Sequence, residues 1–326
     1  MEIILQIALL IIGFIILIKG ADWLVDGASS AASNFRVSKL LIGLTIVAFG
    51  TGAPELAVSF SSIISGSTDI LVGNVIGSNI INILLLIGIA AIIRPIRIKR
   101  DTVAKELPLL LLISVALVVL ILDLFLSEAT INTFSRADAI ICLLFFSIFL
   151  YYLIAMARRN RQASAGAKEV EAPKYKLGKS LLLVVVGLVG VVGGSQLVVN
   201  SASFIASAIG VSERIISLTI IALGTSLPEL VTTITAARKD ECDLLVGNIV
   251  GSNIFNICVV LALPVLFAGT ITPDHFEVID IVMLVLAPLL LCIFAGHHQK
   301  INRLDGVVML TIFLLYYSYI VYGALA

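Results

Sequence analysis

Apolar residues fill this chain in runs that are long enough to cross a bilayer, and charged residues gather between the runs. A spanning helix needs about 20 mostly apolar residues. We predict ten such helices, with approximate limits of 3–27, 37–65, 69–92, 103–123, 135–157, 178–207, 212–237, 243–268, 276–296 and 303–324. The first run is longer than the apolar core of a signal peptide and lacks a small-residue cleavage site, so we expect a first spanning helix there.

Composition agrees with this pattern. Of the 326 residues, 60% are hydrophobic and only 13% are charged, whereas soluble domains carry about 25% charged residues. We therefore expect an all-α, multi-pass protein of the cell membrane. The net charge of zero argues against a nucleic-acid partner, and the four cysteines form no CxxC pair that would indicate a zinc site or a disulfide framework.

One long polar segment divides the chain. It predicts a first five-helix unit at 1–157, a cytoplasmic linker at 158–177 and a second five-helix unit at 178–326. With the N-terminus outside, every Lys and Arg falls on the inner side except Lys19, Arg136 and Arg214. Because basic residues favour the cytoplasmic side, this bias predicts an N-out, C-out orientation.

The two units repeat each other. The stretch LTIVAFGTGAPEL matches LTIIALGTSLPEL, and DILVGNVIGSNIINI matches DLLVGNIVGSNIFNI, at a constant separation of 174 positions. Five helices per unit is an odd number, so the second unit enters the membrane with opposite polarity. This is the inverted-repeat plan of secondary transporters, which bind their substrate near the membrane midplane between matching interrupted helices.

The first repeated block carries a helix break and a carboxylate at membrane depth. A proline precedes Glu55 and Glu229, and we expect the break to free backbone carbonyls near Ala48 and Ala222. The hydroxyls of Thr51, Thr225 and Ser226 stand beside them. An all-oxygen environment of this kind suits hard cations such as Ca²⁺ and Na⁺, and two intramembrane carboxylates at matching positions indicate a functional site.

The second block, GNxxGSNxxN, combines small residues with neutral oxygen atoms. Its glycines would let helices approach closely. Helical spacing places Ser78 and Asn82 on one face, and Ser252 and Asn256 on another.

Together the two blocks resemble the alpha-repeats of the cation/calcium exchanger superfamily, and most closely its microbial sodium/calcium exchanger branch. The resemblance implies antiport of Ca²⁺ against Na⁺ by alternating access, without an enzymatic activity or a cofactor. It implies that both glutamates are central ligands and that Thr51 and Thr225 ligate through hydroxyl and backbone oxygens. The remaining implied roles are carbonyls of Ala48 and Ala222 for sodium, further sodium ligands from Ser78, Ser252 and Ser226, and Asn82 and Asn256 lining the middle of the site.

This chain departs from the family pattern at two positions. Gly52 stands where the second motif has Ser226, so one sodium site lacks a hydroxyl. Asn256 replaces the aspartate of potassium-dependent members, which argues against potassium transport.

Four function classes remain to be separated. The leading one is a Na⁺/Ca²⁺ antiporter that works as a monomer in the lipid bilayer, and the alternative is an H⁺/Ca²⁺ antiporter on the same scaffold. A channel fits poorly because a single pair of glutamates forms no pore-lining ring. An intramembrane enzyme would need a nucleophile with a base or a zinc motif, and the apolar segments contain neither.

Overall fold

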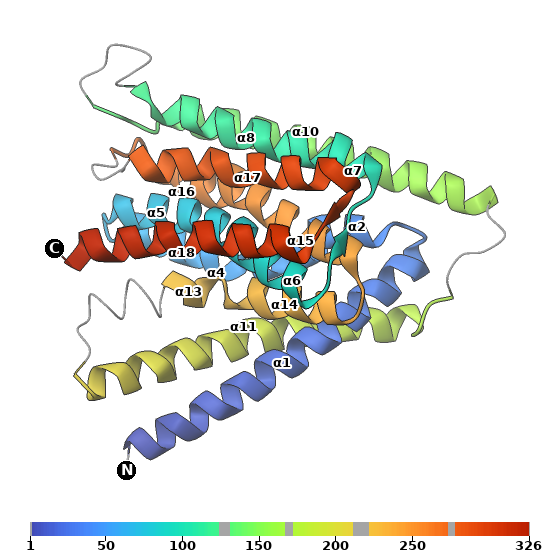
Figure 1. Cartoon of the computed structure of the whole chain (residues 1–326), viewed down its shortest axis with the longest axis horizontal. Coiled ribbons are helices and arrows are strands. Elements are labelled where there is room, and N and C mark those ends of the chain that lie inside the picture. Colours follow the sequence, from blue (N-terminus) through green and yellow to red (C-terminus); the bar gives the residue numbers. More distant parts are fainter. Residues whose placement is uncertain (1, 124–130, 167–171, 211–221, 273–277, 326) are drawn as a thin grey trace.

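The protein is a bundle of long helices, seen here in a computed structural model that describes residues 2–123, 131–166, 172–210, 222–272 and 278–325 (Figure 1). The first part of the chain forms α1 (Glu2–Phe35), α2 (Lys39–Ile42), η1 (Gly43–Val47), α3 (Ala48–Thr51), α4 (Ala53–Ile64), α5 (Thr68–Ile80), η2 (Ile81–Ile87), α6 (Gly88–Ile93), α7 (Arg100–Ala104), α8 (Glu106–Ile121) and α10 (Arg136–Gly166). The second part forms α11 (Leu177–Ala208), α13 (Ala222–Thr225), α14 (Leu227–Arg238), α15 (Cys242–Phe255), η4 (Asn256–Leu261), α16 (Ala262–Ala268), α17 (Val278–His298) and α18 (Arg303–Leu325). The segments named η are π-helical.

Nine candidate membrane spans lie in the described part of the chain. Eight are helices that are long and apolar enough to cross a bilayer, and the ninth is the bent pair Lys39–Thr51 and Ala53–Ile64. The tenth predicted span, 212–237, starts outside the described residues, and α14 covers its second part. Two helices are longer than predicted: α1 continues to Phe35, and α10 continues to Gly166.

The outermost pair, α1 and α11, is held together by glycines. A Cβ added to any of three glycines on α1 would meet the backbone of α11. Gly13 lies against Gly194 and Val198, Gly20 against Gly187 and Val191, and Gly27 against Ser180 and Val184. Rising numbers on one helix meet falling numbers on the other, so the two helices are antiparallel and lie side by side (Figure 1). Helix backbones can approach this closely only where side chains are absent.

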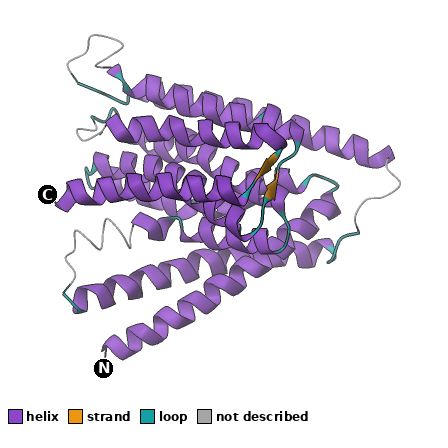
Figure 2. Ribbon diagram, viewed as in Figure 1, coloured by secondary structure: helices purple, strands orange, loops and turns teal. Residues whose placement is uncertain are grey.

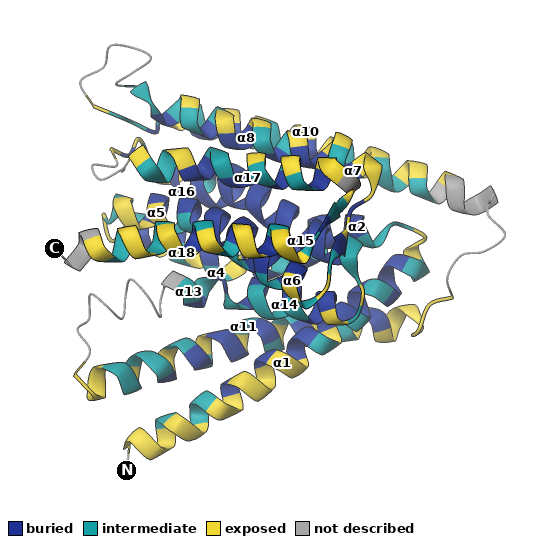
Figure 3. Cartoon of the chain, in the orientation of Figure 1, coloured by how far each residue is buried: buried dark blue, intermediate teal, exposed yellow. Residues whose placement is uncertain are grey.

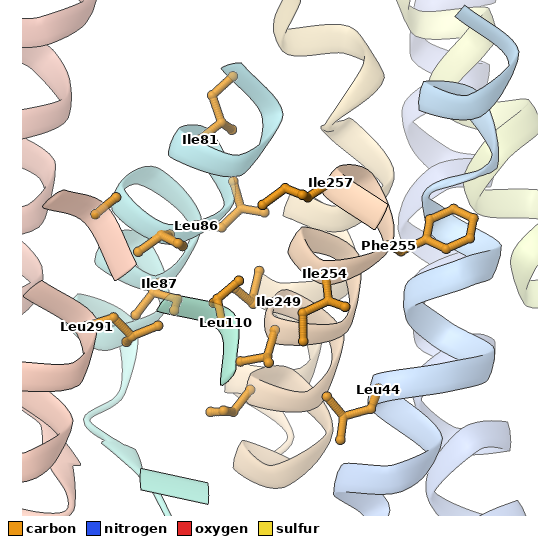
Figure 4. Close-up of a cluster of buried hydrophobic side chains, with 14 of the residues drawn as sticks. Leu44, Ile81, Leu86, Ile87, Leu110, Ile249, Ile254, Phe255, Ile257 and Leu291 are labelled. Atoms are coloured by element: carbon orange, nitrogen blue, oxygen red, sulfur yellow. The ribbon is translucent and has the colours of Figure 1, made fainter. Parts of the chain in front are cut away.

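The apolar core surrounds α15 and η4. Side chains from η1, η2 and α8 converge on them, including Leu44, Leu86 and Leu110, whereas Leu291 of α17 lies farther out, beside Ile87 of η2 (Figure 4). Large apolar side chains on the outer faces of α1, α10, α11 and α18 are exposed instead (Figure 3). Apolar outer surfaces around a partly polar interior are expected of a protein whose solvent is lipid.

A short pair of strands ties two connections together at one end of the bundle (Figure 2). Strand β1 (Ile96–Arg97) follows α6, strand β2 (Lys300–Ile301) precedes α18, and Ile96 pairs with Ile301 in an antiparallel register. This contact fixes the ends of α6, α17 and α18 relative to one another.

Candidate functional site

Two helix breaks create the candidate site. Gly52 separates α3 from α4, with φ −78° and ψ 2°, and Ser226 separates α13 from α14, with φ −88° and ψ 5°. Pro54 and Pro228 lie in the first turn of the new helices, where a missing N–H costs little. The local sequence, with its proline in the first turn, therefore accounts for each break.

The two breaks bring the predicted carboxylates together. Glu55 and Glu229 are each 1% exposed, and their charges are close enough to repel each other. Both Glu55 carboxylate oxygens and Oε2 of Glu229 have no hydrogen-bond partner in the described residues. A buried pair of carboxylates is costly unless a cation or a proton compensates the charge.

Thr51 connects the two halves of this site. Its hydroxyl is fully buried, donates to the Val47 carbonyl at 3.1 Å and lies 3.4 Å from Oδ1 of Asn248. The same side chain is within hydrogen-bonding reach of Glu229. Thr225, its counterpart, is half-buried beside Ser226, whose buried hydroxyl has no partner among the described residues.

A second polar layer comes from α5–η2 and α15–η4. Asn82 donates to Asn253 across the two halves at 3.2 Å, and Asn82 and Asn256 lie in the π-helical segments that follow the GNxxGSN blocks. Ser78 and Ser252 are buried one turn earlier. Interruption of the α-helical ladder by π-turns is common at functional sites.

This layer has more polar atoms than protein partners. The described residues offer no hydrogen-bond partner to one set of buried atoms: Oδ1 of Asn82, Oδ1 of Asn256, Oγ of Ser252, both amide atoms of Asn79, Nδ2 of Asn253 and Nδ2 of Asn248. Unsatisfied buried polar groups are rare in proteins and need an explanation.

One expectation about the backbone is wrong. The Ala48 carbonyl is not freed, because it accepts the N–H of Gly52 at 3.0 Å. Proline deprives the carbonyl four residues earlier of its donor, and those carbonyls belong to Gly50 and Gly224. Ala48 still has a second lone pair for a ligand. Ala222 starts α13, and its side chain is outside the described part.

The structure adds residues that the sequence analysis did not single out. Asn74 donates to the Glu55 carbonyl at 3.2 Å and to the Ser59 hydroxyl at 3.4 Å. Asn74 and Asn248 are the first asparagines of the two GNxxGSN blocks, so the repeat itself contained the signal. Both amides brace the region of the carboxylates from neighbouring helices.

The donor set restricts the cation. Within the described residues, no three His, Cys, Asp or Glu side chains gather where they could hold a metal ion. Any ligands beyond the two carboxylates must therefore be hydroxyl, amide or carbonyl oxygens, which hard cations prefer.

Comparison with known proteins agrees with this chemistry. A family model described as sodium/calcium exchanger protein matches residues 5–155 and 179–322. The putative antiporter CaxA of Alkalimonas amylolytica is 38% identical, over 96% of this chain and 98% of its own. The sodium/calcium exchanger MaX1 of Methanosarcina acetivorans is 30% identical, over 93% and 94%.

A solved structure extends the agreement to the fold. The sodium-calcium exchanger NCX_Mj, soaked with 10 mM Na⁺ and zero Ca²⁺, superposes with a TM-score of 0.81 at 33% identity, over 96% of this chain and 98% of that chain. The resemblance seen in the repeated motifs is thereby confirmed. This multi-pass cell-membrane protein belongs to the sodium/calcium exchanger family of transporters.

Proposed function

We propose that this chain exchanges Ca²⁺ for Na⁺ by alternating access. The observation that carries the proposal is the pair of buried carboxylates at two opposed helix breaks, with three of their four oxygens unpartnered by described residues. One Ca²⁺ or two Na⁺ would neutralise the pair. An empty, doubly charged site is costly in low dielectric, which disfavours crossing over without cargo.

The ligand roles that the resemblance implies are proposed for the same residues. Glu55 and Glu229 serve both ions, and Thr51 and Thr225 contribute hydroxyl and backbone oxygens. The carbonyls of Ala48 and Ala222 and the hydroxyls of Ser78, Ser252 and Ser226 complete the sodium sites, while Asn82 and Asn256 line the centre. The hydroxyls of Ser226 and Ser252 and the Oδ1 atoms of Asn82 and Asn256 have no hydrogen-bond partner among the described residues, which supports these roles.

The transporter uses ten helices in two inverted repeats, with both termini outside and the connection at 158–177 in the cytoplasm. Antiparallel packing of α1 against α11, which are matching helices of the two repeats, supports the inversion. Their glycine-lined contact joins α1 and α11 closely, and we propose that this pair slides as one unit across the remaining helices to open each side in turn.

A proton-coupled exchanger is the second candidate. Gly52 lacks the hydroxyl that Ser226 supplies, and buried carboxylates readily take up protons. Sodium is preferred because threonine stands in both GT motifs, where the similar proton/calcium branch usually has asparagine, and because NCX_Mj is a sodium-calcium exchanger.

Transport in proteoliposomes distinguishes sodium-coupled from proton-coupled Ca²⁺ exchange. Vesicles loaded with Na⁺ should accumulate radioactive Ca²⁺, and a sodium ionophore that collapses the gradient should stop the uptake. Gradients of H⁺ and K⁺ are varied independently in parallel vesicles. Uptake that follows the pH gradient and ignores Na⁺ would replace the sodium proposal with the proton one.

A further inference from the structure

The carbonyls of Gly50 and Gly224 are the two that the prolines leave without a helical donor. A proline has no N–H for the carbonyl four residues earlier, and Pro54 and Pro228 stand at that distance. A buried carbonyl without a donor is costly. The groups that contact these two carbonyl oxygens therefore determine how firmly each helix break is held in place.

In the second half of the chain, another helix supplies the missing donor. Ser195 on α11 is buried, and its hydroxyl donates to the Gly224 carbonyl at 3.1 Å. Val199, one turn later on α11, packs directly on Gly224, where an added Cβ would lie 2.3 Å from Val199 Cγ2. A single turn of α11 thus holds α13 by a hydrogen bond and by close packing.

The position that matches Ser195 in the first half carries no hydroxyl. Ala21 occupies the position 174 residues before Ser195, and alanine cannot donate. Gly50 is covered by Leu188 of α11, whose Cδ2 would lie 2.4 Å from an added Cβ. The long helix α11 therefore contacts both helix breaks. Its Ser195 hydroxyl forms a hydrogen bond at the break before Glu229.

We propose that Ser195 is a positioning residue for cation exchange. In the conformation described here, its hydrogen bond to the Gly224 carbonyl holds α13 against α11 and sets the place of Ser226 and of Glu229, the third residue of α14; the proposed sliding of α11 would have to break this bond. Ala21, at the matching position of the Glu55 half, has no hydroxyl to donate, so the two halves differ at this position. This inference rests on the proposed function, because it concerns the same cation site.

A matched pair of substitutions tests the role. Ser195→Ala removes the hydroxyl that holds Gly224, whereas Ser201→Ala removes an equally buried hydroxyl from the same helix that has no partner in the described residues. We expect Ser195→Ala to raise the KM for Ca²⁺ by about three- to tenfold, as loss of one buried hydrogen bond implies, with little change in kcat. Ser201→Ala should stay within about twofold of the parent protein in both constants.

Hydrogen–deuterium exchange of the α13–α14 segment gives a second readout that needs no transport. Amides of Leu227–Arg238 should exchange faster in Ser195→Ala and remain unchanged in Ser201→Ala. Equal KM values in the two variants, or a fall in kcat alone, would overturn the positioning role. If the parent protein did not transport Ca²⁺, the proposed function would be overturned instead. The hydrogen–deuterium exchange rates of α14 would still decide whether Ser195 holds the break.

Discussion

At the scale of single residues, the decisive feature is the unequal treatment of three buried carboxylates. Glu106 at the start of α8 is as buried as the two site glutamates; its Oε1 accepts a hydrogen bond from Tyr152, and its Oε2 has no partner among the described residues. Among the described residues, neither carboxylate oxygen of Glu55 has a hydrogen-bond partner, Glu229 has a side-chain partner only in Thr51, and the two carboxylates lie close enough to repel each other. Burial alone therefore does not mark the site; the proximity of two buried carboxylates does.

Glu55→Gln or Glu229→Gln should abolish Ca²⁺ exchange while the protein still folds. Losing a group that merely supports a metal ligand already costs roughly 10–100-fold in affinity, so losing the ligand charge should cost more than about 100-fold. Radioactive Ca²⁺ uptake in proteoliposomes measures this loss.

The control is Glu106→Gln, which makes the same change at a buried carboxylate outside the site and should retain exchange. In cation-free buffer, either site variant should unfold at a temperature equal to or above that of the parent protein, because a repulsion between like charges is removed. Parent-like exchange in either site variant would contradict the assignment.

At the scale of elements, glycines decide which helix faces can meet. Gly194 lies against α1, where an added Cβ would be 2.6 Å from the Leu17 backbone nitrogen. Its neighbour Gly193 is exposed on the same helix, with no atom of the described residues within 4 Å of an added Cβ. Two adjacent glycines thus have opposite structural roles.

Gly194→Ala should lower the free energy of unfolding by about 1–3 kcal/mol, because a methyl group cannot enter a backbone contact without moving one of the helices. Gly193→Ala should be neutral or slightly stabilising, since alanine favours a helix by up to about 1 kcal/mol over glycine. Thermal unfolding in detergent compares the two. Equal losses would mean that α1 and α11 do not pack through this face.

The helix pattern itself was largely predictable, and its interruptions were partly so. The apolar runs predicted the spans, and the prolines before Glu55 and Glu229 predicted the breaks. The π-helical segments around Asn82 and Asn256 had no local signal, because they depend on how α5 and α15 pack into the core. The Ala48 carbonyl, which we expected to be free, also keeps a helical hydrogen bond, from the N–H of Gly52.

At the scale of the whole molecule, charged residues link distant elements at the end of the bundle that carries most basic side chains. Lys239, just after α14, contacts Asp22 at 3.3 Å and Asp26 at 2.9 Å on α1. Lys174 binds Asp26 from the connecting segment, and this hydrogen bond raises the pKa of Lys174. Glu241 binds Lys39 of α2 at 3.0 Å. These pairs border a cavity of about 440 Å³.

Lys239→Ala should loosen α1 from α14 and ease access to this end of the bundle. Half-exposed ion pairs contribute only about 0.2–1 kcal/mol, so we expect a two- to fivefold faster reaction of a reporter cysteine, Ser33→Cys, with an impermeant maleimide. Cys242 and Cys292 are replaced by serine in all variants.

The control for this effect is Lys105→Ala, whose partner Asp101 lies four residues away on the neighbouring turn. Removing that local pair should leave the reporter rate unchanged. The effect of Lys239→Ala should also shrink at high ionic strength, because salt screens these charges. A salt-independent change would show that Lys239 acts by packing and not by charge.

The sequence by itself determined the membrane class, the repeated motifs, the breaks and the identity of the paired glutamates, because each depends on residues close together in the chain or on a fixed offset. The tertiary structure decided which of these residues meet. The contacts of Thr51 with Asn248, of Asn82 with Asn253 and of Ser195 with Gly224 join segments that are far apart in sequence. Such contacts arise only when helices pack in one particular register, and no local pattern of residues encodes that register.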